Sequence, residues 1–337
     1  MKLKGKDFIL GFQHLFAMFG ATVLVPALTG LSVSSTLLFA GLGTLLFHLV
    51  TGRKVPAFLG SSFAFLGGYF AVSALCQENG ITNFSAYAGV GVACAGLVYV
   101  VLAILFKIFG AGRVMKYFPP VVTGPIIIAI GLTLSSTAIS SCSDNWIIAL
   151  IAVLVVIVCN IWGKGMVKII PILLGVIISY LSAVVMGKVD FTAVREAAWI
   201  GLPVATLDET VFSLFKNCNT SVLITSIITI MPIALATIIE HIGDVSAISS
   251  TVGKNFIANP GLHRTLIGDG CATAMAALFG APANTTYGEN TGVLALTKVY
   301  DPRVIRLAAI FAVLLSFSPK FAAIISAMPT ATMGGIS

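Results

Sequence analysis

Charged residues are scarce in this chain of 337 amino acids. Only 9% of the residues are Asp, Glu, Lys or Arg, whereas 58% belong to the hydrophobic set. A soluble domain carries roughly a quarter charged residues, so this composition excludes a molecule whose main solvent is water. The mean hydropathy is +1.05, and the charges separate apolar stretches long enough to cross a hydrocarbon core, which takes about 20 helical residues. The sequence therefore indicates an all-α polytopic membrane protein embedded in a lipid bilayer.

Long basic runs and spaced cysteine motifs are absent as well. The net charge of +7 comes from short groups of Lys and Arg beside apolar segments, so we expect no nucleic-acid partner. The cysteines lack the spacing of metal or redox sites; we interpret them as packing residues and expect no metal and no bound cofactor. They are Cys76, Cys94, Cys142, Cys159, Cys218 and Cys271.

Eleven apolar segments are predicted from hydrophobicity and from the Gly, Pro and charged residues between them. A basic N-terminus precedes the first segment, which is long and lacks a small-residue cleavage site, so we interpret it as a span and not as a signal peptide. The segments are 11–29, 34–50, 57–75, 86–108, 120–139, 145–162, 167–187, 220–242, 265–280, 286–298 and 305–327.

The basic residues predict the orientation of these spans. With a cytoplasmic N-terminus, fifteen of the nineteen Lys and Arg residues fall in inside loops, as the positive-inside rule requires. We therefore expect a multi-pass protein with its N-terminus in the cytoplasm. The inside residues are Lys2, Lys4, Lys6, Arg53, Lys54, Lys107, Arg113, Lys116, Lys164, Lys168, Lys254, Arg264, Lys298, Arg303 and Arg306.

Two segments do not have the pattern of continuous helices. Residues 55–65 read VPAFLGSSFAF and residues 281–290 read APANTTYGEN. Pro and Gly remove or loosen helical hydrogen bonds, so each opening is predicted to be extended and to lead into a half-length helix. Seven spans lie between the two segments, so the openings should run in opposite directions, as in an inverted-repeat transporter with its site near the midplane.

Acidic residues inside the membrane are costly and need a partner or a function. Glu240 and Asp244 lie four residues apart at the predicted end of the eighth span and share a helix face, and Glu289 lies in the broken tenth segment. Two acids at this spacing favour holding a proton between them. The alternative for the first two is a solvated helix end at the cytoplasmic interface, which fits Asp244 better than Glu240.

The roles expected for the other polar residues in the spans are less specific. His241 points about 100° away from Glu240 around the helix and could simply face the interface. Gln13 and His14 should hydrogen-bond to another helix, in packing or in substrate contact. Asp269 is expected to cap or brace backbone near the tenth segment.

The site composition predicts a planar ligand. Carboxylates accept hydrogen bonds, a broken helix presents both donors and carbonyls, and Phe63 and Tyr287 provide flat apolar faces. A ring with N–H and C=O edges satisfies all three conditions. Uracil is the smallest common molecule of this kind, but this reasoning does not separate it from xanthine.

Four sequence blocks resemble the nucleobase-ascorbate transporter family, and most of all its bacterial uracil permeases. They are QHLFAMFGAT at 13–22, LGSSFAF at 59–65, EHIGD at 240–244 and TTYGENTG at 285–292, the last followed by Thr297-Lys298. The resemblance implies a bacterial inner-membrane symporter that takes up uracil or a related pyrimidine with protons by alternating access. The alternative is that the chain is a purine permease of the same family, with xanthine or urate as its substrate.

The resemblance also implies fourteen segments in two inverted sevens, with a core domain that moves against a gate domain and a homodimer in the full-length form. On this basis residues 1–117 and 220–328 form the two parts of the core, and 118–219 form the first part of the gate. Residues 329–337 resemble the start of the twelfth segment, so about eleven of fourteen segments are expected. A non-transporting fragment is therefore an alternative.

Site residues follow from the same resemblance. Substrate contacts would come from Ala21, Phe63, Glu240, Tyr287, Gly288 and Glu289, proton coupling from Glu240, Asp244 and His241, and support from Gln13, His14 and Asn290. The acid at Glu289 favours uracil, because members that prefer xanthine or urate usually have Gln there. Asp244 stands where some uracil permeases have His, which leaves the proton route open.

Two other function classes are disfavoured. A channel could also use broken helices, but no ion-filter loop is present. An intramembrane enzyme could use Glu240, His241 and Asp244, but the chain has neither a His-Glu-x-x-His pattern nor a nucleophile elbow. We expect a transporter and not an enzyme.

Overall fold

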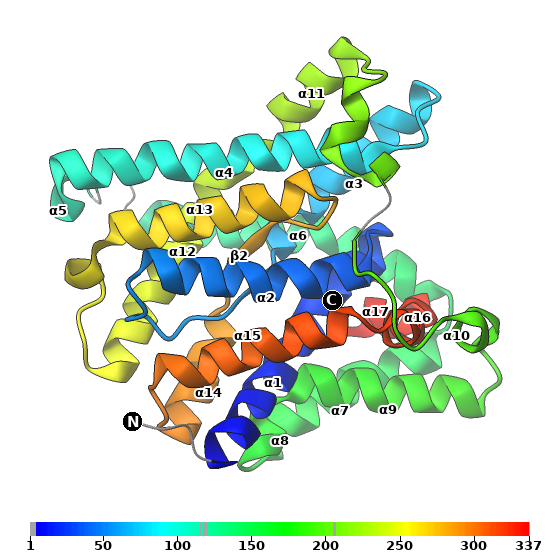
Figure 1. The fold of residues 1–337 in the computed structure, drawn as a ribbon. Helices are drawn as coiled ribbons and strands as arrows, with labels where there is room; N and C mark the ends of the chain where they lie inside the picture. The colour runs from blue at the N-terminus through cyan, green and yellow to red at the C-terminus, as the bar shows by residue number, and fades with distance from the viewer. Residues whose placement is uncertain (1–4, 115, 117–119, 205–206, 337) are drawn as a thin grey trace.

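The computed structural model describes residues 5–114, 116, 120–204 and 207–336 as an almost entirely helical molecule (Figure 1). The elements before the middle of the chain are α1 (Gly5–Thr29), α2 (Val33–Val50), β1 (Leu59–Ser61), η1 (Phe63–Phe65), α3 (Leu66–Glu78), α4 (Phe84–Phe109), α5 (Ala111–Val114), α6 (Pro120–Ser143), α7 (Trp146–Trp162), α8 (Met166–Ile169), α9 (Pro171–Val185) and α10 (Thr192–Glu196). The later elements are η3 (Leu207–Glu209), η4 (Val211–Phe215), α11 (Thr220–Ile230), α12 (Ile233–Val252), η5 (Ile257–Gly261), α13 (Leu262–Leu278), β2 (Asn284–Thr286), α14 (Gly288–Thr297), α15 (Pro302–Ser316), α16 (Pro319–Ser326) and α17 (Thr330–Ile336).

Many helices begin at a residue whose side chain accepts a hydrogen bond from the first turn. Such a cap satisfies amide groups that have no partner inside the helix. The caps of this kind are Ser32 before α2, Asn83 before α4, Asn145 before α7, Asn219 before α11, Asp301 before α15 and Ser318 before α16. Local sequence therefore fixes where these apolar helices start.

Two segments cross the molecule as interrupted elements, as the sequence predicts. β1 and β2 pair antiparallel, with Leu59 opposite Thr286 and Ser61 opposite Asn284. The helices behind them, α3 and α14, contain 13 and 10 residues, well short of the roughly 20 that a span requires. The antiparallel pairing confirms that the two openings run in opposite directions.

Three described helices are long and apolar enough to cross a membrane unaided: α2, α4 and the α11–α12 segment Thr220–Val252. The predicted span 305–327 is instead two helices, α15 and α16, bent by 87°. The prediction of one continuous span is wrong there, because Ser318 caps a new helix that starts at Pro319 and a proline cannot continue the helix before it.

The eighth span is also longer than predicted. α11 and α12 are separated by Met231-Pro232, and α12 continues to Val252 before Gly253 ends it in a left-handed conformation. Glu240 and Asp244 therefore lie within the helix and not at its end, which corrects the predicted boundary at residue 242.

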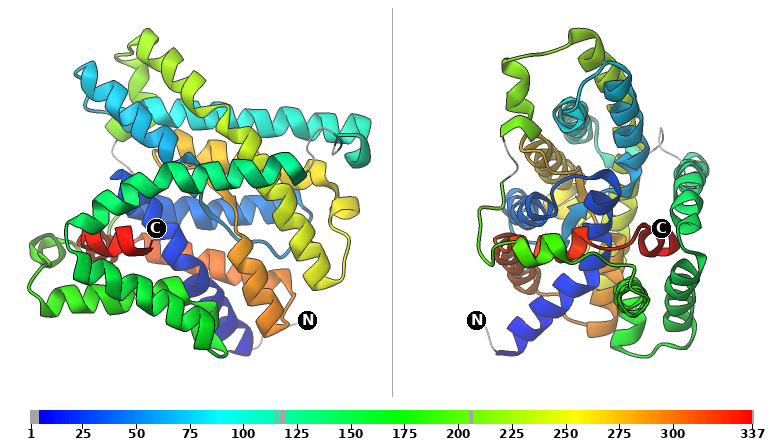
Figure 2. Two further views of the ribbon diagram at one scale, coloured as in Figure 1. Left: turned by 180° about the vertical axis from the view of Figure 1, so that it is seen from behind. Right: turned by 90° about the vertical axis from the view of Figure 1, so that its right-hand side faces the viewer.

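The helices form two groups. α13 packs against α4 and α2, and α15 packs against α2 and α1, giving the successive rows seen in Figure 1. In the second group α7 packs on α9, and α17 packs on α6, α7 and α9; these helices lie along one side of the molecule in the right-hand view of Figure 2. The short strands lie inside the first group.

Small residues allow α4 and α13 to approach closely. A Cβ atom on Gly96 would lie 2.6 Å from the carbonyl oxygen of Gly270, and a Cβ on Gly270 would lie 2.5 Å from the Cβ of Tyr99. Close backbone contact of this kind is a main source of helix association in membranes, where lipid and side chains are equally apolar.

We expect Gly96→Ala to destabilise the protein by about 1–3 kcal/mol, because the added methyl group meets backbone that cannot easily move. Gly67→Ala on α3 is the matched control, since nothing lies within 4 Å of its Cβ position. Thermal melting of both variants in detergent checks this, and equal melting temperatures would contradict the tight α4–α13 contact.

Candidate functional site

The two Pro-Ala openings meet in the interior of the first helix group. All six strand residues are buried, and the backbone pairing continues beyond them: Ser62 N donates to Ala283 O at 2.8 Å and Tyr287 N donates to Phe58 O at 3.1 Å. Main-chain groups released by the broken helices thus find partners in each other, as a segment at membrane depth requires.

Side chains of the tenth segment brace the third. Asn290 Nδ2 donates to the carbonyl of Pro56 at 2.7 Å, and the Tyr287 hydroxyl donates to the carbonyl of Ser61 at 2.9 Å. The Tyr287 ring lies against Gly60, where a Cβ would be 2.6 Å from ring atoms. Tyr287 is 4% exposed, and its hydroxyl also accepts a hydrogen bond from Thr22 Oγ1 on α1 at 3.3 Å; its predicted contact with substrate stays a prediction.

Flanking helices hold the strand pair from the other side. Ser61 Oγ donates to the carbonyl of Thr22 on α1 at 2.9 Å, and Leu59 N donates to Thr44 Oγ1 on α2 at 2.9 Å. Asn284 Nδ2 donates to the carbonyl of Phe39 at 2.8 Å. These contacts could not be predicted from the sequence, because Ser and Thr in apolar helices also bond to their own preceding turn, as Thr22 does with Met18.

The acidic face of α12 is directed at the start of α14. Asp244 is half-buried and its Oδ2 accepts a hydrogen bond from Thr286 Oγ1 at 3.2 Å. Its Oδ1 lies 3.0 Å from the position that a Cβ on Gly288 would take. Glu240, one turn earlier on the same face, is exposed in this structure. The reading of Asp244 as an idle helix end does not fit this placement, because its carboxylate contacts the broken tenth segment.

His241 does not face the interface, which corrects that expectation. It is fully buried, with Nδ1 2.8 Å from Asp269 Oδ2 and 3.1 Å from Thr286 Oγ1. The rotation of about 100° away from Glu240 turns the imidazole into the interior, toward α13. His241 is therefore joined to both α13 and β2.

Asp269 also differs from its expected role. Its carboxylate, 0% exposed on α13, meets the His241 imidazole and not the backbone of the tenth segment. It acts on that segment only indirectly, since His241 in turn contacts Thr286 of β2.

The remaining predicted residues are distributed around this centre. Phe63 begins η1 and is half-buried, Gly288 is the exposed first residue of α14, and α1 carries the buried His14 and the half-buried Gln13. The side chains of Ala21 and Glu289 lie outside the described part of the structure, so their predicted roles stay predictions. Within the described residues, no group of three or more His, Cys, Asp or Glu side chains is arranged to hold a metal ion.

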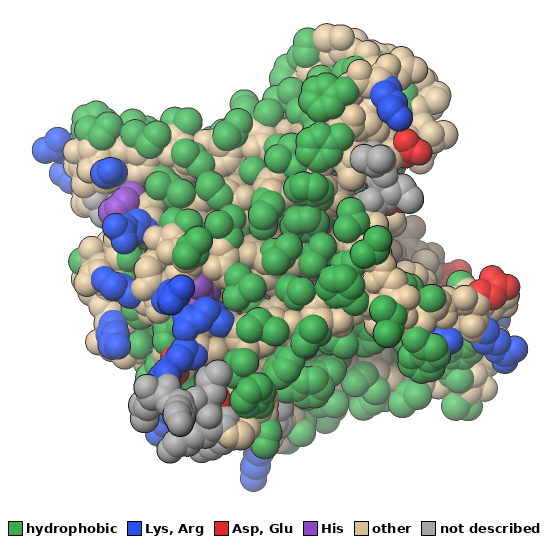
Figure 3. All heavy atoms as spheres, viewed as in Figure 1, with side chains coloured by type: hydrophobic (Ala, Val, Ile, Leu, Met, Phe, Trp, Pro, Cys, Tyr) green, Lys and Arg blue, Asp and Glu red, His purple; other side chains and the backbone are tan. Residues whose placement is uncertain are grey.

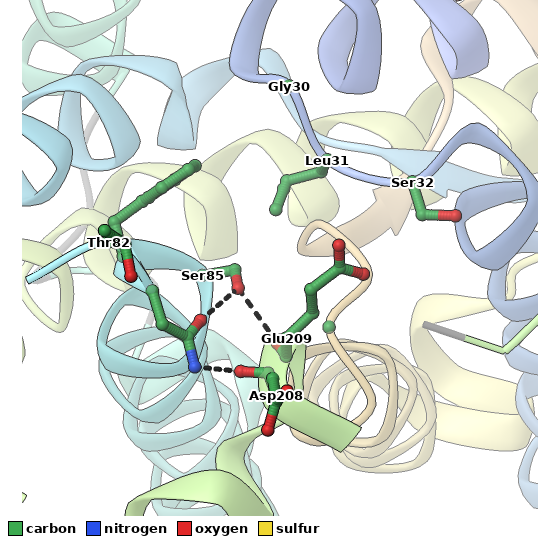
Figure 4. A pocket seen from close by; sticks show the side chains of 10 residues that line it. Gly30, Leu31, Ser32, Thr82, Ser85, Asp208 and Glu209 are labelled. Carbon is green, nitrogen blue, oxygen red and sulfur yellow. Dashed lines mark hydrogen bonds between the residues drawn. The ribbon is translucent and has the colours of Figure 1, made fainter. Parts of the chain in front are cut away.

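A separate cavity of about 280 Å³ lies between the start of α4, the turn before α2 and residues 208–209 (Figure 4). Ser85 Oγ donates to the carbonyl of Glu209 at 3.0 Å, and Asn83 Nδ2 donates to the carbonyl of Asp208. None of the predicted site residues lines it: its lining residues are Gly30, Leu31, Ser32, Thr82, Asn83, Phe84, Ser85, Asp208, Glu209 and Gly280. We interpret it as the junction where the segment leaving the second helix group is tied to α4.

The interrupted antiparallel segments and the intramembrane acids beside them define a membrane transporter with a broken-helix centre. The fold is that of the transmembrane domain of a cyanobacterial bicarbonate transporter, BicA, with a TM-score of 0.73 at 15% identity over 99% of this chain and 88% of that one. The chain belongs to the Permease family, which it matches over residues 5–337. It is thus a multi-pass transporter and not an enzyme, and the resemblance to nucleobase-ascorbate transporters is confirmed at the level of the family.

Curated relatives are similar along almost the whole chain. The probable uracil permease of Pasteurella multocida is 41% identical over 98% of this chain and 77% of its own length. The uracil permease of Bacillus caldolyticus is 42% identical over 99% of this chain and 76% of its own length.

We expect Tyr287→Phe to cost about 0.5–1.5 kcal/mol of stability, because the variant loses the buried hydrogen bond to the Ser61 carbonyl. Tyr180→Phe is the control, since its hydroxyl donates to the Ile324 carbonyl at an exposed position and should matter less. Melting curves in detergent compare the two; a larger effect at Tyr180 would argue against the bracing role of Tyr287.

Proposed function

We propose that this protein takes up uracil, or a closely related pyrimidine, together with protons. The observation that carries the proposal is the placement of α12: Asp244 on its acidic face meets the end of β2 at Thr286 and the start of the half-helix α14 at Gly288. Relatives named as uracil permeases, at 41–42% identity, share this chain almost end to end.

The chemistry of this region fits a flat ring with both donor and acceptor edges. A carboxylate on Glu240 can accept ring N–H groups. The first two residues of α14, Gly288 and Glu289, present backbone N–H groups that have no carbonyl partner in the preceding turn and can donate to a ring carbonyl, whereas Asn290 N already donates to the Tyr287 carbonyl. Phe63 offers an aromatic face beside the strand pair. We assign the second carboxylate contact to Glu289 and a lining role to Ala21, on the family resemblance.

Proton coupling is assigned to the same face of α12. Glu240 and Asp244 lie four residues apart, and two carboxylates at this spacing repel when both are ionised, which favours binding of a proton. Loading of one proton would lower the cost of burying this face when the transporter closes over its ligand.

Alternating access is proposed to arise from movement between the two helix groups. The core comprises residues 1–117 and 220–328, and residues 118–219 form the gate part to which α6, α7 and α9 belong. Dimer formation and a cytoplasmic N-terminus in a bacterial inner membrane are further parts of the proposal. In support of the orientation, Lys and Arg side chains gather at the end of the molecule where α4 and α2 terminate (Figure 3).

The purified chain should bind radiolabelled uracil saturably, and xanthine at least about tenfold more weakly, because a ring of different shape leaves polar groups of the site unpaired. Equilibrium binding with uracil, xanthine and ascorbate checks this. Tighter binding of xanthine would replace the pyrimidine assignment with a purine permease of the same family.

In proteoliposomes with an inward proton gradient, Glu240→Gln should reduce uracil accumulation to the level without a gradient, because an amide cannot take up a proton. Glu196→Gln, on the exposed helix α10, is the matched control and should accumulate uracil normally. Gradient-driven accumulation by Glu240→Gln, or insensitivity of the unmodified chain to a protonophore, would refute the proton coupling.

A further inference from the structure

Four polar side chains form a continuous line between α13, α12 and β2. Asp269 Oδ2 lies 2.8 Å from His241 Nδ1, which lies 3.1 Å from Thr286 Oγ1, and Thr286 Oγ1 lies 3.2 Å from Asp244 Oδ2. Asp269 and His241 are 0% exposed and Thr286 is 1% exposed, whereas Asp244 is half-buried. The line therefore links a carboxylate in the core to a carboxylate at the edge of the proposed site.

The surroundings of His241 determine which ring nitrogen carries the proton. Its Nε2 has no hydrogen-bond partner among the described residues, and its ring lies edge-on to Phe47 and Tyr99, with centroids 6.3 and 6.5 Å away. A proton on Nε2 would be unpaired in apolar surroundings, so the neutral ring carries its proton on Nδ1.

The Nδ1–H group donates to Thr286 Oγ1, while Asp269 Oδ2 lies 2.8 Å from Nδ1 without the geometry of a hydrogen bond. The Thr286 hydroxyl accepts there and donates its own hydrogen to Asp244. Each hydrogen bond is then donated in the direction from His241 toward Asp244. The Asp244 carboxyl group must accept the last of these bonds, and a carboxyl group accepts best in its ionised form.

Ionised Asp244 is also favoured by α14. Its Oδ1 lies beside Gly288, the first residue of that helix, and a negative charge is stabilised at a helix N-terminus. Protonation of Asp244 weakens both this attraction and the hydrogen bond from Thr286. The contact between α12 and the start of α14 is therefore sensitive to one proton.

We propose that His241 and Asp269 are positioning residues that act through the Thr286 hydroxyl to hold Asp244 ionised, and so set the pH at which α12 releases the α14 half-helix. The inference rests on the proton coupling proposed above. Other titratable groups around the line are Glu240 on α12, Tyr99 on α4 and His48 on α2, which bonds to the Ala57 carbonyl. The test must therefore isolate Asp244.

Two substitutions at Thr286 distinguish the effect of the hydroxyl group from the effect of the side-chain shape. Thr286→Val keeps the β-branched form that suits β2, while Thr286→Ser keeps the hydroxyl. The measurement is hydrogen–deuterium exchange of the peptides that cover 284–297, on the purified chain in nanodiscs without uracil, over a pH series corrected for intrinsic exchange.

In the unmodified chain, protection of these peptides should fall below a midpoint pH at which Asp244 becomes protonated. Thr286→Val should move this midpoint upward by about one pH unit, since the ionised form loses a hydrogen bond. Thr286→Ser should leave the midpoint in place. Asp244→Asn should abolish the step, which assigns it to this residue and not to its titratable neighbours.

A second pair of variants keeps the test decisive if Thr286→Val does not fold. His241→Asn places an amide nitrogen near the Nδ1 position and should retain the midpoint, whereas His241→Gln places it near Nε2 and should shift the midpoint upward. A single midpoint shared by the unmodified chain, Thr286→Val and His241→Gln would overturn the proposal.

The proposed function and the positioning role are tested independently. Uracil binding tests the proposed function, and the exchange experiment, which contains no uracil, tests the positioning role. Absence of uracil binding with the predicted shifts would leave the positioning role standing. Normal uracil binding with unchanged midpoints would remove only the positioning role.

Discussion

A backbone that leaves the helical conformation inside a membrane must find hydrogen-bond partners within the protein. Here the two interruptions satisfy each other as the antiparallel pair β1–β2. Each strand covers only three residues, so the pair could not stand alone. The carbonyls of Pro56 and Ser61 receive side chains from the opposite segment, and α1 and α2 supply further bonds. The centre is thus held by polar contacts from several helices.

This arrangement has a direct consequence for binding. A half-helix that starts within the protein directs the N–H groups of its first turn, and the positive end of its dipole, toward the groups that pack beside its start. α14 starts in this way at Gly288, and the Asp244 carboxylate of α12 lies beside it. Donors and acceptors are therefore brought together by the same interruption that the strand pair makes possible.

The sequence predicts the features that depend on local chemistry. Pro56 and Pro282 remove helical donors wherever they occur, so the broken segments could be recognised, and the spacing of Glu240 and Asp244 defines a shared face on any helix. The end of α12 could not be predicted from hydrophobicity. Ser246 and Ser249 follow the apolar stretch, but their hydroxyls bond to the preceding turn, at 2.7 and 2.6 Å, and the helix continues.

Features that depend on neighbouring elements were not predictable. The rotation of His241 from Glu240 is fixed by helix geometry, but whether that direction is the interior depends on where α13 packs. The partner of Asp269 is likewise set by tertiary structure, as is the pairing of Thr286 with Asp244. The family resemblance identifies the residues of these motifs without giving their contacts.

The buried pair of Asp269 and His241 is hard to explain by stability alone. Taking ionisable groups out of water is costly, and replacing a buried pair by well-packed apolar residues is often neutral or stabilising. The cost can be explained if the pair fixes one arrangement of hydrogen bonds around His241 among several. His241 joins three elements, α12, α13 and β2, and an apolar side chain at this junction could fill the volume but could not select the hydrogen-bond partner of Thr286. The half-helix α14 lies beside the titratable Asp244. Only polar contacts can fix the direction of the hydrogen bond that Asp244 receives from Thr286.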